Sequence, residues 1–354
     1  MDFPNEVRNA LLQNAAQLMP ITVGWSSYTI CSLTIEEVAK TMRGNCHFAD
    51  FVINTRRHYR ASWQDGLYLQ HREDKQPESK YTSPAVARVH ESSFDGQKIS
   101  GASRNETDQN WLVIRNDLAV SAARDIESAY VGSEYFEHCG FLMPGRIIDL
   151  LQKTPVRSKV LQVLGEDGEL TNLDEVELDG RKVIRLRILS DNPVRRHAEN
   201  VDLEKARIEL NRTAESEESK ISIIEDIKSQ RNLPEKCVNV FYLDPQLNYA
   251  LRRSEWNYPQ SDWVRTLDCE DLQPVPAKQI HLPRKCLARG PIKTDVMEVT
   301  EISVDPLPAE RFSLKDICTT PGTSIHEILE GDRRKQYVVE ADGTLKEIRR
   351  GYRA

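Results

Sequence analysis

Short runs in which apolar and polar residues alternate dominate this sequence, and this is the period of two that β-strands require. The most apolar run, residues 238–243, is β-branched, aromatic and aliphatic, and predicts a largely buried strand. Asp244 and Pro245 predict a turn, because proline fixes its own φ and disfavours a helical conformation in the residue before it. Asn248 tolerates a left-handed conformation, so a more polar strand over residues 249–256 is expected to complete a hairpin.

Turn signals recur along the chain and predict an antiparallel sheet. Type I′ hairpins favour Asp-Gly because both central residues take a positive φ. Five such dipeptides occur, at residues 65–66, 95–96, 167–168, 179–180 and 342–343. After the fourth, Ile184, Leu186 and Ile188 alternate with Arg185 and Arg187, which gives one apolar and one basic face. Repeated short hairpins of this kind predict a strand meander.

The sheet is predicted to bend and to be covered by other segments. In residues 296–304 the alternation slips by one between Val299 and Ile302, which indicates a β-bulge, and a bulge curves a sheet. The segment 130–153 is rich in aromatic residues and is expected to pack over the sheet, with a short helix over residues 146–152.

Two helices are predicted near the N-terminus. The first follows Pro4 and carries on one face the apolar residues Val7, Leu11, Ala15 and Leu18. The second covers residues 35–42 and begins with a capping box, in which Thr34 is followed three residues later by Glu37. We expect both helices to pack against the sheet.

The length of the chain bears on its domain organisation. Single cores tend to divide beyond about 250–300 residues, so 354 residues indicate either two domains or one extended sheet. We predict one domain over residues 1–354. Within it, residues 191–235 are strongly charged and poor in apolar residues, which predicts an insertion of one or two surface helices or a partly disordered excursion.

Composition and charge exclude several classes of function. Hydrophobic residues make up 39% and charged residues 29% of the chain, which is typical of a globular protein. The formal net charge of −7 repels phosphate backbones and anionic lipid surfaces, so nucleic-acid binding is not expected. No apolar run approaches the roughly 18–20 residues of a transmembrane helix. The sequence around Met1 has no signal-peptide pattern, which predicts the cytoplasm if Met1 is the native start, and the periplasm or cell envelope if a leader has been removed.

The cysteines are dispersed and form no Cys-x-x-Cys pair, which argues against a zinc ribbon or a dense disulfide framework. The seven are Cys31, Cys46, Cys139, Cys237, Cys269, Cys286 and Cys318. Two bridges, between Cys31 and Cys46 or between Cys269 and Cys286, remain open alternatives in an oxidising compartment. Small buried thiols are the favoured interpretation.

No catalytic or metal-binding residue can be assigned from motifs. Gly-x-Ser-x-Gly, Gly-x-x-x-x-Gly-Lys and Gly-x-Gly-x-x-Gly patterns are absent. His326 and the residues after it resemble the start of a zinc-protease helix, but Glu330 stands where the second histidine is needed. Histidine and cysteine are adjacent at residues 46–47 and 138–139, and adjacent side chains point apart. We therefore assign no catalytic residue, no metal and no cofactor.

Taken in order, these turns and strands resemble the outer-membrane lipoprotein-sorting or lipoprotein-carrier-like (LolA-like) family, in its long planctomycete-type version. The resemblance spans nearly the whole chain and is carried by Phe3-Pro4 leading to Trp25, Phe94-Asp95-Gly96, residues 241–245 with Tyr249 and Arg252-Arg253, Leu282-Pro283-Arg284, Phe312-Ser313-Leu314, Pro321-Gly322-Thr323 and Asp342-Gly343. It implies an α+β fold, a large curved antiparallel sheet or half-open β-barrel, with helices covering a concave face that holds the acyl chains of a lipid or lipoprotein. The insertion 191–235 and His326-Glu327 depart from the family pattern.

Two functions of different classes follow. The first is non-catalytic binding of an apolar ligand in the cell envelope, between the curved sheet and the helices at residues 7–18 and 35–42. The alternative is a structural or protein-interaction module, in which the insertion 191–235 contacts a partner. An enzyme would need His138, Cys139 or His326 to converge with a carboxylate in one cleft. The ligand-binding residues and the oligomeric state stay unassigned.

Overall fold

A single 16-stranded sheet runs through the molecule. The computed structural model describes residues 3–41, 45–82, 85–117, 134–144, 149–150, 152–165, 168–211, 217–257, 264–328 and 334–348. The strands of the sheet are β1 (Ile21–Cys31), β2 (Arg56–Gln64), β3 (Leu67–Gln76), β4 (Val86–Phe94), β5 (Lys98–Asn105), β6 (Leu112–Asp117), β9 (Glu169–Leu178), β10 (Arg181–Asp191), β11 (Lys236–Asp244), β12 (Ala250–Asn257), β13 (Val264–Pro274), β14 (His281–Arg289), β15 (Lys293–Ser303), β16 (Ser324–Ile328), β17 (Arg334–Val339) and β18 (Leu345–Glu347).

Helices and a small second sheet complete the fold. The second sheet pairs β7 (Phe141–Leu142) with β8 (Arg157–Ser158). The helices are α1 (Asn5–Gln17), α2 (Ile35–Thr41), α3 (Cys46–Asn54), α5 (Glu134–His138), α7 (Lys159–Gly165), α8 (Pro193–Asn200), α9 (Leu203–Leu210), α10 (Glu217–Arg231) and α11 (Lys315–Cys318), with 3-10 turns η1 (Pro245–Leu247) and η2 (Ala309–Ser313). Of the helices that the structure describes, none is long and apolar enough to cross a membrane.

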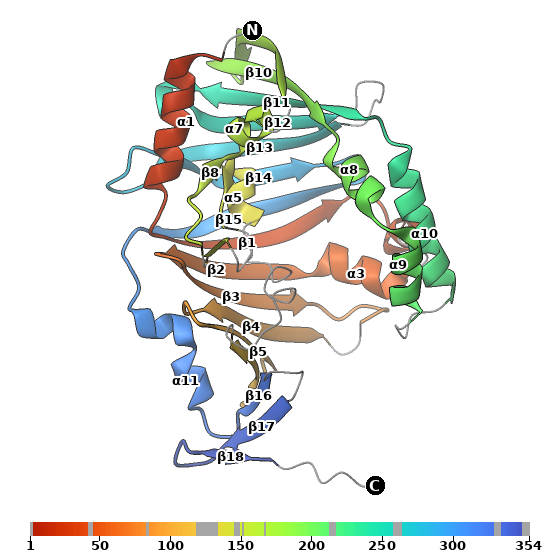
Figure 1. The fold of residues 1–354 in the computed structure, drawn as a ribbon, viewed down its shortest axis with the longest axis vertical. Helices are drawn as coiled ribbons and strands as arrows, with labels where there is room; N and C mark the ends of the chain where they lie inside the picture. Colours follow the sequence, from red (N-terminus) through yellow and green to blue (C-terminus); the bar gives the residue numbers. More distant parts are fainter. Residues whose placement is uncertain are drawn as a thin grey trace.

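Two antiparallel meanders meet at the first strand. β1 to β6 follow one another on one side, β9 to β15 follow one another on the other, and β1 pairs with β15 to join them (Figure 1). The predicted large curved antiparallel sheet, open at its edges and covered by helices on its concave face, is thereby confirmed. One pair is parallel: β16 returns from η2 and α11 to lie beside β6, with Ile325 opposite Val113. A parallel pair needs a crossover connection, which no turn signal in the sequence marks.

The predicted bulge and the predicted central hairpin are both confirmed. Trp25 pairs with Val299 and Gly24 with Glu301, so Thr300 is the extra residue that bends β15. β11 and β12 form the hairpin, joined by η1, and Asn248 has a φ of 52°.

The Asp-Gly turns divide into three kinds. Asp65-Gly66 and Asp179-Gly180 have positive φ at both residues and close the predicted two-residue hairpins. At residues 95–96 and 342–343 only the glycine has positive φ, and the hairpins are longer. The prediction of a hairpin at residues 167–168 is wrong, because helix α7 precedes this site and only β9 follows it. Asp167 itself lies outside the described residues.

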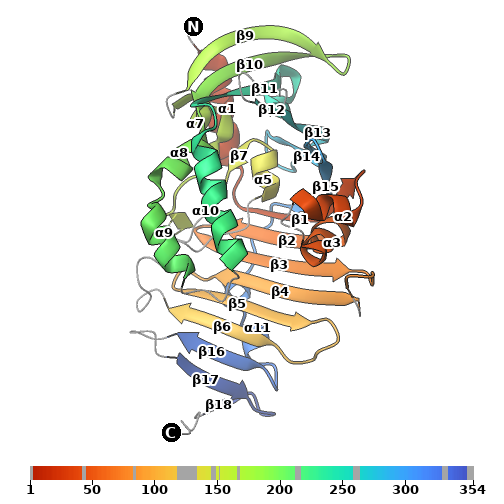
Figure 2. The same cartoon turned by 90° about the vertical axis from the view of Figure 1, so that its right-hand side faces the viewer.

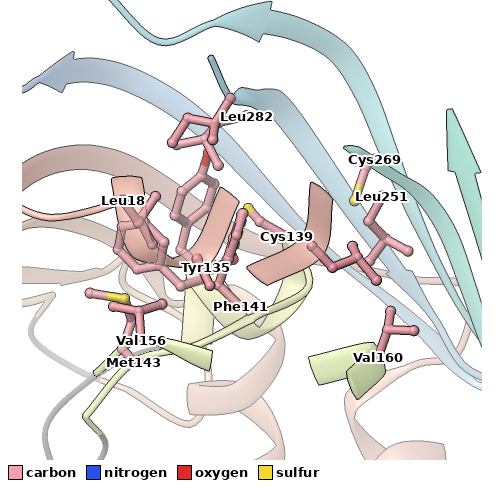
Figure 3. Packing of buried hydrophobic residues seen from close by; sticks show 14 of the residues in the cluster. Leu18, Tyr135, Cys139, Phe141, Met143, Val156, Val160, Leu251, Cys269 and Leu282 are labelled. Atoms are coloured by element: carbon pink, nitrogen blue, oxygen red, sulfur yellow. Dashed lines mark hydrogen bonds between the residues drawn. The ribbon is translucent and has the colours of Figure 1, made fainter. Parts of the chain in front are cut away.

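The inner face of the sheet carries the main core. All four predicted apolar residues of the first helix, Val7, Leu11, Ala15 and Leu18, are buried against it. Tyr135 of α5 is fully buried beside Leu18 and donates a hydrogen bond to the Pro283 carbonyl at 2.9 Å (Figure 3). The aromatic segment therefore packs over the sheet as predicted, and most of its predicted helix at 146–152 lies outside the described residues.

A second, smaller core lies on the outer face. Phe312, Leu314 and Cys318 of the η2–α11 segment pack on Val113 and Ile325, the two residues that pair between β6 and β16. The sequence analysis did not predict this cluster. The crossover that makes β16 parallel to β6 is thus held to the sheet by its own apolar residues.

Helices also occupy the charged stretch 191–235. Asn192 caps α8, accepting hydrogen bonds from the amides of Val194 and Arg195. Figure 2 shows α8, α9 and α10 on the same side of the sheet as α7. That this stretch is an insertion in a single domain stays a prediction.

Candidate functional site: a groove on the inner face

The inner face is closed where α1 and α5 cover it. Trp25 stacks on Tyr59 with ring centroids 4.8 Å apart, and Trp63 meets Phe136 edge to face at 5.0 Å. Next to Leu11 a cavity of only about 20 Å³ remains, about the size of one water molecule. The sequence analysis placed a ligand partly under the first helix, and the structure fills that space with side chains.

The inner face is open beside the C-terminal end of α5 and along α7. A cavity of about 320 Å³ lies there between these helices and strands β11 to β14. Its lining residues are Glu137, His138, Lys159, Val163, Pro193, Asn239, Phe241, Ser254, Glu255, Trp256, Arg265, Leu267 and Ala288.

A second cavity of about 410 Å³ adjoins the first. It lies between α2, α3 and the β14–β15 hairpin, and is lined by Cys31, Val38, Val52, Ile53, Arg265, Ala288, Gly290, Pro291, Ile292, Lys293 and Asp295. Arg265 and Ala288 line both cavities. The two cavities therefore adjoin at these residues, and we call them together the inner groove.

The strand register explains why the inner groove opens at Ala288. Ala288 pairs with Leu267 on one side and with Asp295 on the other, so all three face inward. Its single methyl group leaves the space that a larger side chain would fill. α2, which lines the second cavity through Val38, begins with the predicted capping box, in which Glu37 accepts a hydrogen bond from the Thr34 amide at 2.8 Å.

The first cavity is charged on two sides. Lys159, the first residue of α7, enters it from the helical side, and Arg265 enters it from β13. Burial lowers the pKa of the Lys159 ammonium, the nearby Arg265 charge lowers it further, and Glu137 acts in the opposite direction. Lys159 is therefore a partly desolvated cation whose nearby charges do not restore its ordinary pKa.

The second cavity is mainly apolar, and its acidic residue Asp295 already has partners. Asp295 accepts a hydrogen bond from the Thr29 hydroxyl at 2.8 Å and forms an ion pair with Lys293 at 2.9 Å. Val38 of α2, Val52 and Ile53 of α3, and Ile292 of the β14–β15 hairpin supply its aliphatic wall. This part of the inner groove can accommodate an apolar chain without leaving a buried charge unpaired.

The residues that the motifs singled out do not converge. His326 lies on strand β16 and not on a helix, which rules out the zinc-protease arrangement. Cys46 and His47 open α3, whereas His138 ends α5 and lines the first cavity. Among the described residues, no three His, Cys, Asp or Glu side chains gather closely enough to hold a metal ion. All seven cysteines are free thiols, and five of them are buried.

The sequence analysis missed Lys159, Arg265 and Ala288. One signal was available: Arg265 occupies an inward position in the same alternation as Leu267 and Cys269, where an apolar residue is expected. Lys159 carried no local signal, because its role depends on a strand more than a hundred positions away. Ala288 is an ordinary small residue until the register places it between the two cavities.

The fold and the inner groove together define a half-open barrel with a partly apolar internal cavity. No protein-family model matches the sequence, and no curated protein matches it. A LolA superfamily protein from Nitrosomonas europaea is similar in structure, with 10% sequence identity and a TM-score of 0.31 over 86% of this chain and 96% of that one. A DUF1329 family protein from Desulfovibrio piger has 10% identity and a TM-score of 0.37 over 87% and 94% of the two chains.

LprF from Mycobacterium bovis is similar too, with 9% identity and a TM-score of 0.29 over 86% of this chain and 96% of that one. The superfamily that the sequence resembles is thus represented among these structures, while the planctomycete-type detail stays a prediction. Because the TM-scores lie below 0.5, the function is argued below from the geometry of this chain alone.

Proposed function

We propose that this protein binds the apolar chain of a lipid or similar amphiphile in the inner groove, without catalysing a reaction. The observation that carries this proposal is that two cavities, of about 320 and 410 Å³, adjoin at Arg265 and Ala288. Volumes of this size lie in the range of small-molecule sites, roughly 300–1,000 Å³. The wall of the second cavity is mainly apolar, which is usual for such sites, while the first cavity is lined by both polar and apolar residues.

The apolar wall supports an estimate of affinity. Each buried methylene contributes about 0.8 kcal/mol, so a chain of about ten methylenes gains roughly 8 kcal/mol before the cost of immobilising it. A gain of this size corresponds to a dissociation constant of about 1 μM. Because ordering the ligand offsets part of it, we expect micromolar or weaker binding for short chains and tighter binding for longer ones.

The alternative function, a protein-interaction module, rests on α9 and α10. Ile208 and Ile221 on these helices are 53% and 57% exposed, although both are large apolar residues. Under this alternative the inner groove takes no ligand, and removal of the helices abolishes a partner interaction. A location in the cell envelope belongs to the lipid-binding proposal and rests on the family resemblance.

Filling the inner groove tests the proposal. We would titrate delipidated protein with Nile red, an uncharged dye whose fluorescence rises in apolar sites. The wild type is expected to bind it saturably. Ala288→Trp places an indole where the two cavities adjoin and should weaken binding about tenfold or more, which is about 1.4 kcal/mol. Val52→Trp narrows the second cavity from α3 and covers the case in which the first variant does not fold.

Val264→Trp is the matched control. Val264 is 38% exposed and lies on the same strand as Arg265, but its side chain points to the other face. Its Nile red affinity should equal that of the wild type. Failure of the wild type to bind the dye, or equal binding by both groove variants, would refute the proposal. Native mass spectrometry followed by organic extraction would then show whether any lipid co-purifies.

A further inference from the structure

We propose that the inner groove selects an amphiphile with a carboxylate head group, held between Lys159 and Arg265, with its apolar chain directed into the second cavity. This inference rests on the proposed function and adds the chemical class and the orientation of the ligand. A long-chain fatty acid is the simplest molecule with this chemistry.

The two cations are placed by different parts of the fold. The Lys159 amide donates a hydrogen bond to the Gly140 carbonyl at 2.9 Å, and its neighbours Ser158 and Val160 are buried. The backbone at Lys159 is therefore fixed while its side chain extends into the first cavity. Arg265 comes from the opposite wall, on β13, where it pairs with Trp256 of β12. An anion between the walls can meet both cations.

Among the residues that the structure describes, the charges around Lys159 leave its ammonium without a hydrogen-bonded carboxylate. Glu137 is exposed and acts on the Lys159 ammonium through space rather than through a hydrogen bond. Glu255 also lines the cavity, but its carboxylate bonds to Tyr242 on the outer face. A desolvated ammonium is stabilised by a charge-assisted hydrogen bond to a carboxylate. A ligand carboxylate would supply this partner.

The second cavity determines which way the ligand lies. Asp295, which lies beside Ala288 where the two cavities adjoin, already accepts a hydrogen bond from Thr29 and pairs with Lys293, so a second carboxylate in the second cavity would meet a negative charge that already has its partners. The wall of the second cavity also includes the aliphatic residues Val38 and Ile292. The apolar chain therefore fits the second cavity, and the acidic head fits the first.

A competition experiment tests the head-group preference. Nile red bound to the wild type would be displaced with a long-chain fatty acid and, in parallel, with the fatty alcohol of the same chain length. The acid is expected to compete at about tenfold lower concentration, as for a hydrogen bond to a charged group. Lys159→Gln and Arg265→Gln should each remove most of this preference and leave displacement by the alcohol unchanged. Lys159→Arg keeps the charge and should retain the preference.

Lys182→Gln is the matched control, since Lys182 is an exposed lysine on β10, and it should behave as the wild type. If the wild type binds the dye but acid and alcohol compete equally, the head-group inference fails and the proposed function stands. If Lys159→Gln and Arg265→Gln keep the full preference, the assignment of these two cations is wrong. If the dye does not bind the wild type at all, the proposed function itself fails.

Discussion

Arg252 donates a hydrogen bond from Nε to Oδ2 of Asp244 at 2.6 Å, across the bulge near the turn of the β11–β12 hairpin. Arg252 is the extra residue of that bulge, because Tyr242 pairs with Arg253 and Leu243 with Leu251. The Asp244 side chain is 1% exposed, and its other oxygen accepts from the Gln246 amide at 2.9 Å. One buried carboxylate thus stabilises both the bulge and the turn.

We expect Asp244→Ala to destabilise the protein by about 3 kcal/mol, because it leaves the guanidinium of Arg252, which is only 16% exposed, without its partner. Chemical denaturation with urea would measure the loss. The control is Asp174→Ala, which removes a 2.6 Å ion pair to Arg185 whose side chains are 35% and 37% exposed. Its effect should be much smaller, since water solvates both charges. Equal effects of the two substitutions would show that burial does not set the strength of these pairs.

Phe312 should anchor the η2–α11 segment to the outer face. It is fully buried, in contact with the cluster that includes Val113 and Ile325. We expect Phe312→Ala to cost about 3–5 kcal/mol, as for other large-to-small substitutions in cores. Phe48→Ala, at a position that is 52% exposed, should change stability by no more than about 0.5 kcal/mol. An unchanged thermal midpoint for Phe312→Ala would mean that the segment is not part of the folded core.

His71 and His90 should contribute to stability with opposite pH dependence. A hydrogen bond from the His71 Nδ1 to Oε1 of Glu91, at 2.6 Å, raises the pKa of His71. The stabilisation that protonated His71 gives to the folded protein is therefore present below the pKa of this side chain in the unfolded chain, about 6.5. It is lost as the pH rises through the higher pKa of His71 in the folded protein. Burial, and after it the Arg72 charge, lowers the pKa of His90. The contribution of neutral His90 to folding stability is therefore present above the pKa of this side chain in the unfolded chain, and it is lost as the pH falls through the lower pKa in the folded protein.

Two glutamine variants would check these signs. The stability difference between the wild type and His71→Gln should shrink from about pH 6 to about pH 9, and stay below about 1 kcal/mol because solvent partly screens this half-buried pair. The stability of the wild type relative to His90→Gln should increase from about pH 6 to about pH 9. Denaturation at each pH would measure both, and parallel pH profiles for the two variants would contradict the assignment.

We expect that position 180 requires glycine only because of its positive φ, and not because a side chain there would meet a neighbour. Its φ is +74°, and a Cβ built there would meet no atom within 4 Å. We expect Gly180→Ala to cost about 1–2 kcal/mol, the penalty for a left-handed conformation with a side chain. Gly101, in strand β5, also has no atom within 4 Å and has no positive φ. Gly101→Ala should be neutral or stabilise by roughly 0.5 kcal/mol, and a loss as large as that at Gly180 would refute the argument.

Features that depend on neighbours in the chain could be read from the sequence. The bulge at Thr300 showed as a slip in alternation, the start of α2 as the spacing of Thr34 and Glu37, and the turn after β11 as Asp244-Pro245. Each is decided by sterics or hydrogen bonds within a few residues, so the local pattern carries the whole signal. The same reasoning failed at residues 167–168, where the segment before the turn is a helix.

By itself, the sequence determined the first two helices, several hairpins and strands, and the curved antiparallel sheet that they build, because alternation and turn chemistry are local. Only the tertiary structure decided that β1 joins β15, that β16 lies parallel to β6, and that Lys159 and Arg265 face one another across a groove. These relationships join residues far apart in the chain, and their stability comes from burying side chains that no local pattern pairs. The groove exists because α1 and α5 fill one part of the inner face, while Ala288 leaves the next part open.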